Sequence, residues 1–124
     1  MNSTEIEKLI NNFFEKLNDK EFESIESYLS PHVVFYFPGT QPLKGSKKVK
    51  QLLQIIYRRY PHLKFRVNDI IIQKNRVAAV WENAGTDRQG RPYRNEGVTI
   101  FTLKQGKVIS MSDYFKDTSF VNGS

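Results

Sequence analysis

The second half of the chain predicts four long consecutive strands, and this order constrains the fold more than any other feature. The segments are rich in β-branched and aromatic side chains and cover residues 63–74, 76–87, 92–104 and 107–116. Short turns separate them at residues 74–75, 89–90 and 104–106. Connections of this length join neighbouring antiparallel strands, and the last one suits a three-residue hairpin with Gly106 in the left-handed conformation. We therefore expect an antiparallel arrangement of these strands.

Three helices are predicted before these strands. Thr4 and Glu7 form a capping box at the start of the first helix. A second, shorter helix covers about residues 19–29, residues 33–37 form a strand, and Ser46 caps a third helix. Helices followed by a run of strands indicate an α+β fold with the helices on one face of a curved antiparallel or mixed sheet. We expect one domain, residues 1–124, with a hollow between helices and sheet in which a small ligand could sit.

Composition excludes several classes of protein. The 124 residues contain no cysteine, which rules out disulfides, thiolate catalysis and Cys-based zinc sites. The sequence begins without a signal-type segment and has no apolar run of membrane-spanning length, so we expect a cytoplasmic protein. The net charge is +6, but the basic residues are scattered, so nucleic-acid binding is not expected. His32 and His62 each follow a proline and lack a third ligand at metal spacing, so we expect no metal site.

The last predicted strand carries an acidic residue on its apolar face. At a period of two, Ile109, Met111, Asp113 and Phe115 share one side of the strand. This side must cover the core, so we expect Asp113 to point inward. An isolated carboxylate there is costly to ionise unless a partner or water reaches it. Asp113 is therefore the first candidate for chemistry, and the alternative is a structural carboxylate that accepts hydrogen bonds at the sheet edge.

Three segments of the sequence carry a family resemblance. They are residues 17–25 (LNDKEFESI), 37–45 (FPGTQPLKG) and 106–111 (GKVISM). Together with the order of the elements, they resemble the SnoaL-like and ketosteroid-isomerase-like branch of the nuclear transport factor 2-like superfamily over nearly the whole chain. The resemblance implies a cone in which a bent sheet wraps round three helices and encloses an apolar pocket, often in a homodimer.

The resemblance also bears on the chemistry. Ketosteroid isomerases use a general-base Asp and an oxyanion hole made by a Tyr and a protonated Asp. The matching positions here hold Tyr36, Phe13 and Thr99, so steroid isomerisation is not expected. Gly97 and Thr99 stand where relatives similar to limonene epoxide hydrolase place paired acids. Polyketide cyclases of the SnoaL type place an acid on the last strand as a proton shuttle, and Asp113 resembles it in position.

The predicted turns also suggest a register for the last three strands. Gly97 would lie opposite both Glu82 and Asp113, so that two carboxylates share one hollow. Their repulsion would raise the pKa of one of them and make it a general acid or base near neutral pH, with Tyr36 assisting. The side chains expected to bind the ligand are Phe13, Tyr57, Tyr93, Asn95, Thr99, Phe101, Met111 and Phe115.

Two expectations concern function and partners. We expect acid/base proton transfer, without a cofactor, on a small apolar cyclic or polyketide-type molecule, with Asp113 as the shuttle. Trp81, Val98 and Ile100 would share the opposite face of the sheet, an apolar patch that suits a twofold homodimer.

Other interpretations of the same residues remain open. The hollow could hold an apolar ligand without catalysis, or side chains could fill it in a protein–protein adaptor. Glu82 could be a rim residue paired with Arg91 or Arg94 rather than a catalytic acid.

Overall fold

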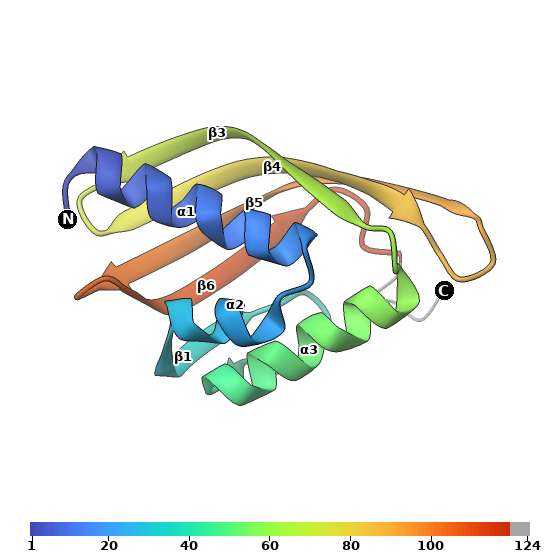
Figure 1. Ribbon diagram of the computed structural model, residues 1–124, viewed down its shortest axis with the longest axis horizontal. Helices are drawn as coiled ribbons and strands as arrows, with labels where there is room; N and C mark the ends of the chain where they lie inside the picture. The colour runs from blue at the N-terminus through green and yellow to red at the C-terminus, as the bar shows by residue number, and fades with distance from the viewer. Residues whose placement is uncertain (120–124) are drawn as a thin grey trace.

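The computed structural model describes residues 1–119 and shows an α+β fold, as predicted. Figure 1 shows how three helices and a six-stranded sheet follow one another along the chain. The elements are α1 (Ser3–Asn18), α2 (Phe22–Tyr28), β1 (Leu29–Tyr36), β2 (Leu43–Lys44), α3 (Ser46–Arg59), β3 (Lys64–Gln73), β4 (Arg76–Thr86), β5 (Pro92–Lys104) and β6 (Lys107–Phe115). The sheet order is β2-β1-β6-β5-β4-β3, and the pairs are antiparallel except β1 with β6.

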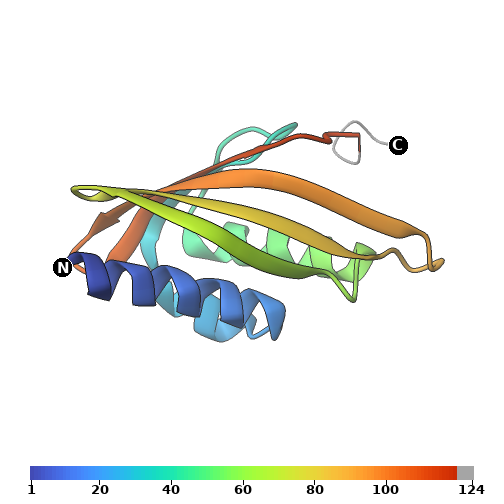
Figure 2. The same cartoon turned by 90° about the horizontal axis from the view of Figure 1, so that it is seen from above.

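The helices lie along one face of the sheet and leave its other face uncovered (Figure 2). The apolar stripe of α1 recurs at helical spacing and is buried, with Ile6, Ile10, Phe13 and Leu17 turned inward. Phe13 packs edge-to-face against Phe101 of β5, with ring centroids 5.5 Å apart. The core therefore forms between the helices and the inner face of the sheet, where burial of apolar area stabilises both layers.

The helix boundaries differ from the prediction where capping residues compete. Asn2 caps α1 in place of Thr4: its Oδ1 accepts from the Glu5 N–H (2.8 Å), and the Glu5 carboxylate accepts from the Asn2 N–H (2.9 Å). Asn is at least as good a cap as Thr, and here it has the same three-residue spacing to a Glu. The second helix begins at Phe22, later than predicted, because Asp19 forms the C-cap of α1. Ser46 does not cap α3: Gly45 is the N-cap, and the Ser46 hydroxyl donates to Glu26 instead.

The loop between β4 and β5 is longer than predicted. It covers residues 87–91, and the Asp87 N–H donates to the Arg91 carbonyl (2.9 Å). The Asp87 carboxylate also accepts from the backbone N–H groups of Gln89 and Arg91. An aspartate that binds its own backbone in this way builds a five-residue loop where a two-residue turn was expected. The pairing of the two strands is displaced by one residue as a result.

This displacement exchanges the two faces of β4. Trp81 lies opposite Gly97 and faces inward, and Glu82 faces outward, so the predicted positions of both residues are wrong. A Cβ at Gly97 would lie 2.7 Å from Trp81 Cζ2, so the indole needs a glycine opposite it. Of the three residues predicted for the outer face, Val98 and Ile100 lie there, because they alternate with inward-facing residues along β5.

The pairing of β5 with β6 is displaced by two residues, which leaves their faces unchanged. Gln105 and Gly106 form a two-residue turn with positive φ angles of 52° and 78°, which confirms the left-handed Gly106 but not the three-residue loop. A bulge follows, with Ile109 as the extra residue. Asp113 lies opposite Thr99 and remains on the inner face, as predicted.

Candidate functional site

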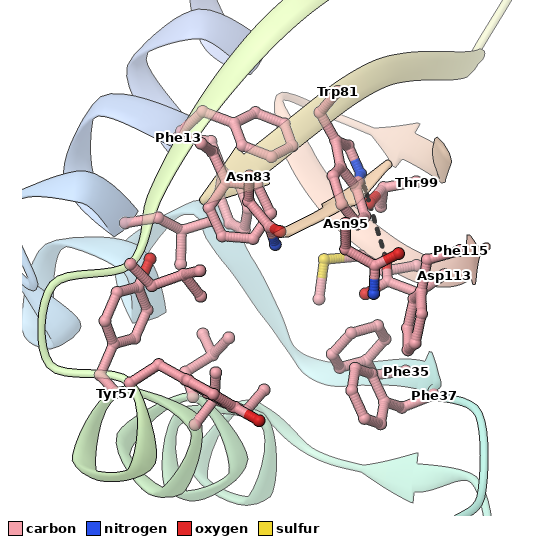
Figure 3. Close-up of a pocket in the computed structure, with 18 of the residues that line it drawn as sticks. Phe13, Phe35, Phe37, Tyr57, Trp81, Asn83, Asn95, Thr99, Asp113 and Phe115 are labelled. Carbon is pink, nitrogen blue, oxygen red and sulfur yellow. Dashed lines mark hydrogen bonds between the residues drawn. The ribbon is translucent and has the colours of Figure 1, made fainter. Parts of the chain in front are cut away.

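A cavity lies between the helices and the inner face of the sheet (Figure 3). The volume open to the centre of a water molecule is about 70 Å³, which has room for a few waters or one small ring. Aromatic and aliphatic side chains make up most of its wall. Seven of the side chains predicted to bind ligand line the cavity: Phe13, Tyr57, Tyr93, Asn95, Thr99, Met111 and Phe115. Phe101 is fully buried in the core instead, against Phe13 and Phe14.

Three side chains on one part of the wall form a directed chain of hydrogen bonds. Trp81 Nε1 donates to Thr99 Oγ1 (2.9 Å), and the Thr99 hydroxyl donates to Asp113 Oδ1 (2.7 Å), as Figure 3 shows. An indole N–H can only donate, so Thr99 must accept from Trp81 and direct its single proton at Asp113. Oδ1 of Asp113 is therefore an acceptor, and a proton on this carboxyl group resides on Oδ2. Within residues 1–119, Oδ2 has no hydrogen-bond partner.

The Asp113 carboxyl group is buried without a basic partner in the described part of the chain, and this changes its pKa. Burial raises the pKa of Asp113 to about 7, and the hydrogen bond from Thr99 offsets part of this rise. No basic side chain of the described part of the chain forms an ion pair with it. The carboxyl group is thus about equally divided between its acid and base forms near neutral pH, which is the range in which proton transfer is efficient.

The other two residues predicted to be catalytic lie outside the cavity. Glu82 is on the outer face of β4, and its Oε1 lies 2.6 Å from Arg66 Nη2. The expected arginine partner was Arg91 or Arg94, so only the paired character of Glu82 is as anticipated. Tyr36 at the end of β1 is half exposed and does not line the cavity. The idea of two carboxylates that share one hollow is therefore wrong, and Asp113 is the one acidic residue on the cavity wall in the described part of the chain.

Two wall residues of β4 are absent from the sequence prediction. Trp81 and Asn83 both face the cavity because of the displaced register. A signal for this face was present, since Val77, Ala79 and Trp81 alternate on one side of the strand and Glu82 lies on the other. Preference for the side that carries the tryptophan over the side that carries the charge would have identified the inner face.

Asn95 lies on the cavity wall and is held by hydrogen bonds to neighbouring groups. Its side-chain Nδ2 donates to Tyr93 Oη (2.8 Å) and to the Asp117 carbonyl (2.8 Å), and its Oδ1 accepts from the Asp117 N–H (3.0 Å). These bonds fasten the segment after β6 to β5. The Asn95 amide is thus engaged within the fold, and its bonds would have to break before it could bind a ligand directly.

Residues 1–119 contain neither a cluster of metal ligands nor a membrane-spanning helix. Across residues 1–119, no three His, Cys, Asp or Glu side chains come together in a way that could hold a metal ion. In the same part of the chain, no helix combines the length and the apolar character required to cross a bilayer.

The fold and the cavity define a class: an α+β cone whose internal cavity is lined, within residues 1–119, by a single carboxyl group, that of Asp113. The chain belongs to the SnoaL-like domain family, whose sequence profile matches residues 10–111. The family resemblance seen in the sequence is thereby confirmed.

Several solved structures share this fold at low sequence identity. A protein from Jannaschia sp. CCS1, assigned as a SnoaL-like polyketide cyclase, has 18% identity and a TM-score of 0.83, with 91% of this chain and 86% of that chain covered. A protein assigned as a polyketide cyclase from Xanthomonas campestris has 16% identity and a TM-score of 0.82, with 98% of each chain covered. A nuclear transport factor 2-like protein of unknown function from Burkholderia pseudomallei has 13% identity and a TM-score of 0.85, with 95% of each covered. No curated protein matches the chain by sequence.

Proposed function

We propose that this protein binds a small apolar, ring-containing molecule in the cavity and that Asp113 shuttles a proton on it without a cofactor. The observation that carries the proposal is the lone carboxyl group on the cavity wall, with its pKa raised to about 7. Both protonation states are populated near neutral pH, so the same group can take a proton and return it. Two proteins of the same fold are assigned as polyketide cyclases, which supports an isomerase-type or cyclase-type reaction.

The proposed step is proton transfer at a carbon next to a carbonyl group. The Asp113 carboxylate takes the proton through Oδ2, and the electron pair of the C–H bond moves into the carbonyl group to give an enolate. The proton then returns from Asp113 to another carbon or to the oxygen, which restores the carboxylate. Thr99 occupies Oδ1 and leaves Oδ2 for the substrate. No oxidant or reductant is consumed.

The test is hydrogen–deuterium exchange at the carbon next to the carbonyl group of cyclopentanone, a ketone with a single small ring, followed by NMR in D₂O. We expect the wild type to accelerate exchange, and Asp113→Asn to reduce the catalysed rate about 10²–10⁴-fold, the usual contribution of a general base. The ketone should still bind, because an Asn carbonyl can accept the hydrogen bond from Thr99. Equal catalysed rates in wild type and variant would exclude Asp113 as the shuttle.

A binding protein without catalysis is the second candidate. The Trp81–Thr99–Asp113 chain favours it, because hydrogen bonds of this kind also suit a structural carboxyl group. Ketone binding without accelerated exchange in the wild type would identify this function. An adaptor whose pocket is filled by side chains is the least supported alternative, because the cavity retains a volume of about 70 Å³ that is open to the centre of a water molecule.

We also propose that the uncovered face of the sheet forms a twofold homodimer. Large apolar side chains are exposed on it, with Tyr36, Ile71 and Tyr114 each at least half accessible. Val98 lies next to Tyr114 on the neighbouring strand, so the apolar area continues across the sheet. An exposed apolar face of this extent is typical of an interaction site.

The charges of this face favour a second copy of the chain as the partner. Arg66 pairs with Glu82, and Lys116 pairs with Glu96. Positive and negative charges therefore both lie beside the exposed apolar side chains of this face. A twofold contact places the same face against itself, and mixed charges allow this without net repulsion.

A further inference from the structure

Two polar atoms on the cavity wall have no hydrogen-bond partner within residues 1–119. They are Tyr57 Oη, from α3, and Asn83 Oδ1, from β4. Both residues are more than nine-tenths buried, with exposed fractions of 5% and 7%. Both line the cavity, and neither takes part in the chain that leads to Asp113. Figure 3 shows Tyr57 across the cavity from Asp113, with the Asn83 amide group between them.

Unpaired buried atoms of this kind are unusual in a folded protein. Residues 1–119 offer no partner to either atom, so only a molecule inside the cavity can supply the missing hydrogen bonds. The fold does not require either group, because Phe in place of Tyr57 and Leu in place of Asn83 would fill similar space without a polar atom. Asn95 shows the usual situation, with both atoms of its amide engaged by neighbours. A molecule inside the cavity is the partner that would satisfy Tyr57 and Asn83.

The chemistry of the two atoms specifies what that molecule must offer. Asn83 Oδ1 can only accept, so it needs an O–H or N–H donor. Tyr57 Oη can donate to an oxygen, and burial raises the pKa of Tyr57, which keeps this hydroxyl neutral and protonated. A ligand hydroxyl group matches both atoms, since it has one proton to donate and lone pairs to accept. A methyl group in the same place would leave both atoms unpaired.

We propose that Tyr57 and Asn83 form a hydroxyl-binding subsite, which selects ligands whose apolar ring carries a hydroxyl group. The inference rests on the proposed use of the cavity as a ligand site and adds the class of ligand. A ring anchored by its hydroxyl group at this subsite would share the cavity with Asp113, which lies on the wall opposite Tyr57 (Figure 3).

The test compares phenol with toluene, two single rings that differ by a hydroxyl group in place of a methyl group. Dissociation constants are measured by NMR titration for the wild type, Tyr57→Phe and Asn83→Leu. Tyr114→Phe is the matched control, because it removes a hydroxyl group from the exposed outer face. We expect the wild type and the control to bind phenol about 10-fold more tightly than toluene, since a site that hydrogen-bonds a hydroxyl group rejects the analogue without one. Tyr57→Phe and Asn83→Leu should each reduce this ratio several-fold while toluene affinity is retained.

The outcomes separate this subsite from the broader proposal. Equal affinity for phenol and toluene in the wild type, or a ratio that neither variant changes, overturns the subsite and leaves the apolar ligand site intact. No binding of either compound overturns both. Thermal unfolding without ligand gives an independent readout: Tyr57→Phe should be at least as stable as the wild type, because it removes an unpaired polar atom. A Tm lower by several degrees would show that the hydroxyl group serves the fold itself, and would also overturn the subsite.

Discussion

At the scale of single residues, the site is distinguished by which polar groups are paired and which are not. Thr99 is bonded on both sides and Asn95 is engaged by its neighbours, whereas Asp113 receives one hydrogen bond and no positive charge. Burial without a cation favours the neutral acid, and this is why the pKa of Asp113 rises to about 7. A carboxyl group in this state costs the fold some stability and gives the cavity a proton donor and acceptor.

The raised pKa of Asp113 predicts a pH-dependent stability. In the unfolded chain the Asp113 carboxyl group has its ordinary pKa of 3.8, and in the folded protein its pKa is about 7. The contribution of the neutral Asp113 carboxyl group to the free energy of unfolding is therefore complete below pH 3.8. This contribution is lost progressively as the pH rises from 3.8 through 7. An asparagine side chain cannot ionise, so Asp113→Asn does not suffer this loss. The free energy of unfolding of the variant, relative to that of the wild type, should therefore rise by at most about 4 kcal/mol between pH 4 and pH 8. Urea unfolding at a series of pH values measures the difference.

Asp69→Asn is the control for this experiment, because it neutralises an exposed carboxylate on β3. Its stability relative to the wild type should change little over the same pH range. A constant difference between Asp113→Asn and the wild type from pH 4 to pH 8 would contradict the raised pKa.

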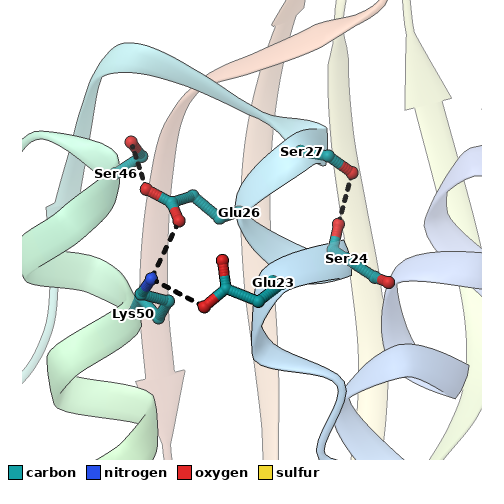
Figure 4. A network of polar contacts seen from close by, with 6 residues as sticks. All are labelled: Glu23, Ser24, Glu26, Ser27, Ser46 and Lys50. Carbon is teal, nitrogen blue, oxygen red and sulfur yellow. Dashed lines mark hydrogen bonds and ion pairs between the residues drawn. The ribbon is translucent and has the colours of Figure 1, made fainter.

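At the scale of elements, α2 depends on its neighbours. It has only seven residues, too few for a helix that is stable alone. Figure 4 shows Lys50 of α3 between Glu23 and Glu26 of α2, with both N–O distances 3.0 Å. Ser46 also donates to Glu26 (3.3 Å). Hydrogen bonding to Lys50 lowers the pKa of Glu26, and the same contact raises the pKa of Lys50, so this network favours both charged forms.

Lys50→Met should lower the Tm slightly, by a few degrees at most, because ion pairs near the surface contribute little. The loss should diminish in high salt, which screens the wild-type pairs. Lys48→Met is the matched control, since Lys48 lies exposed on the same helix and no ion pair is recorded for it within residues 1–119. Differential scanning calorimetry at low and at high salt measures the Tm of the wild type and of each variant. Equal Tm values for the two variants would show that the network does not hold α2.

At the scale of the whole molecule, the fold is one-sided. The helices cover one face of the sheet and leave the other face open (Figure 2). The cavity lies on the covered side, and Tyr36, Ile71 and Tyr114 are exposed on the open side. An antiparallel sheet can leave one face in water, but such a face is usually polar. The proposed homodimer would cover these side chains without altering the cavity, which lies on the opposite side.

The dimer is tested with Tyr114→Lys. Tyr114 is 59% exposed, so a lysine there should be tolerated by the monomer and opposed by a second copy across the twofold axis. Sedimentation velocity at micromolar concentration should give twice the chain mass of 14.5 kDa for the wild type and a single chain for the variant. Ile55→Lys on α3 is the control, because Ile55 is similarly exposed, at 53%, and lies away from the sheet face. A wild-type monomer, or a dimer that Tyr114→Lys leaves unchanged, would refute this interface.

Much of the fold followed from local signals in the sequence. The three helices were identified from apolar spacing, and the strands were bounded to within a few residues by turns such as Gly106. The inward position of Asp113 was also predicted correctly, because the error in the β5–β6 pairing was an even number of residues. The error at β4 was odd, so Glu82 was assigned to the cavity and Trp81 to the outer face.

The sequence by itself determined the elements, their order and the presence of one acid on an apolar strand face. These properties depend on contacts between residues close together in the chain. Only the tertiary structure decided that Asp113 has no second carboxylate beside it, and that Tyr57 and Asn83 are left unpaired at the cavity. Those outcomes depend on a five-residue loop closed by Asp87 and on the packing of a helix against a distant strand. Periodicity tells which residues share a face, and long-range packing decides what each face meets.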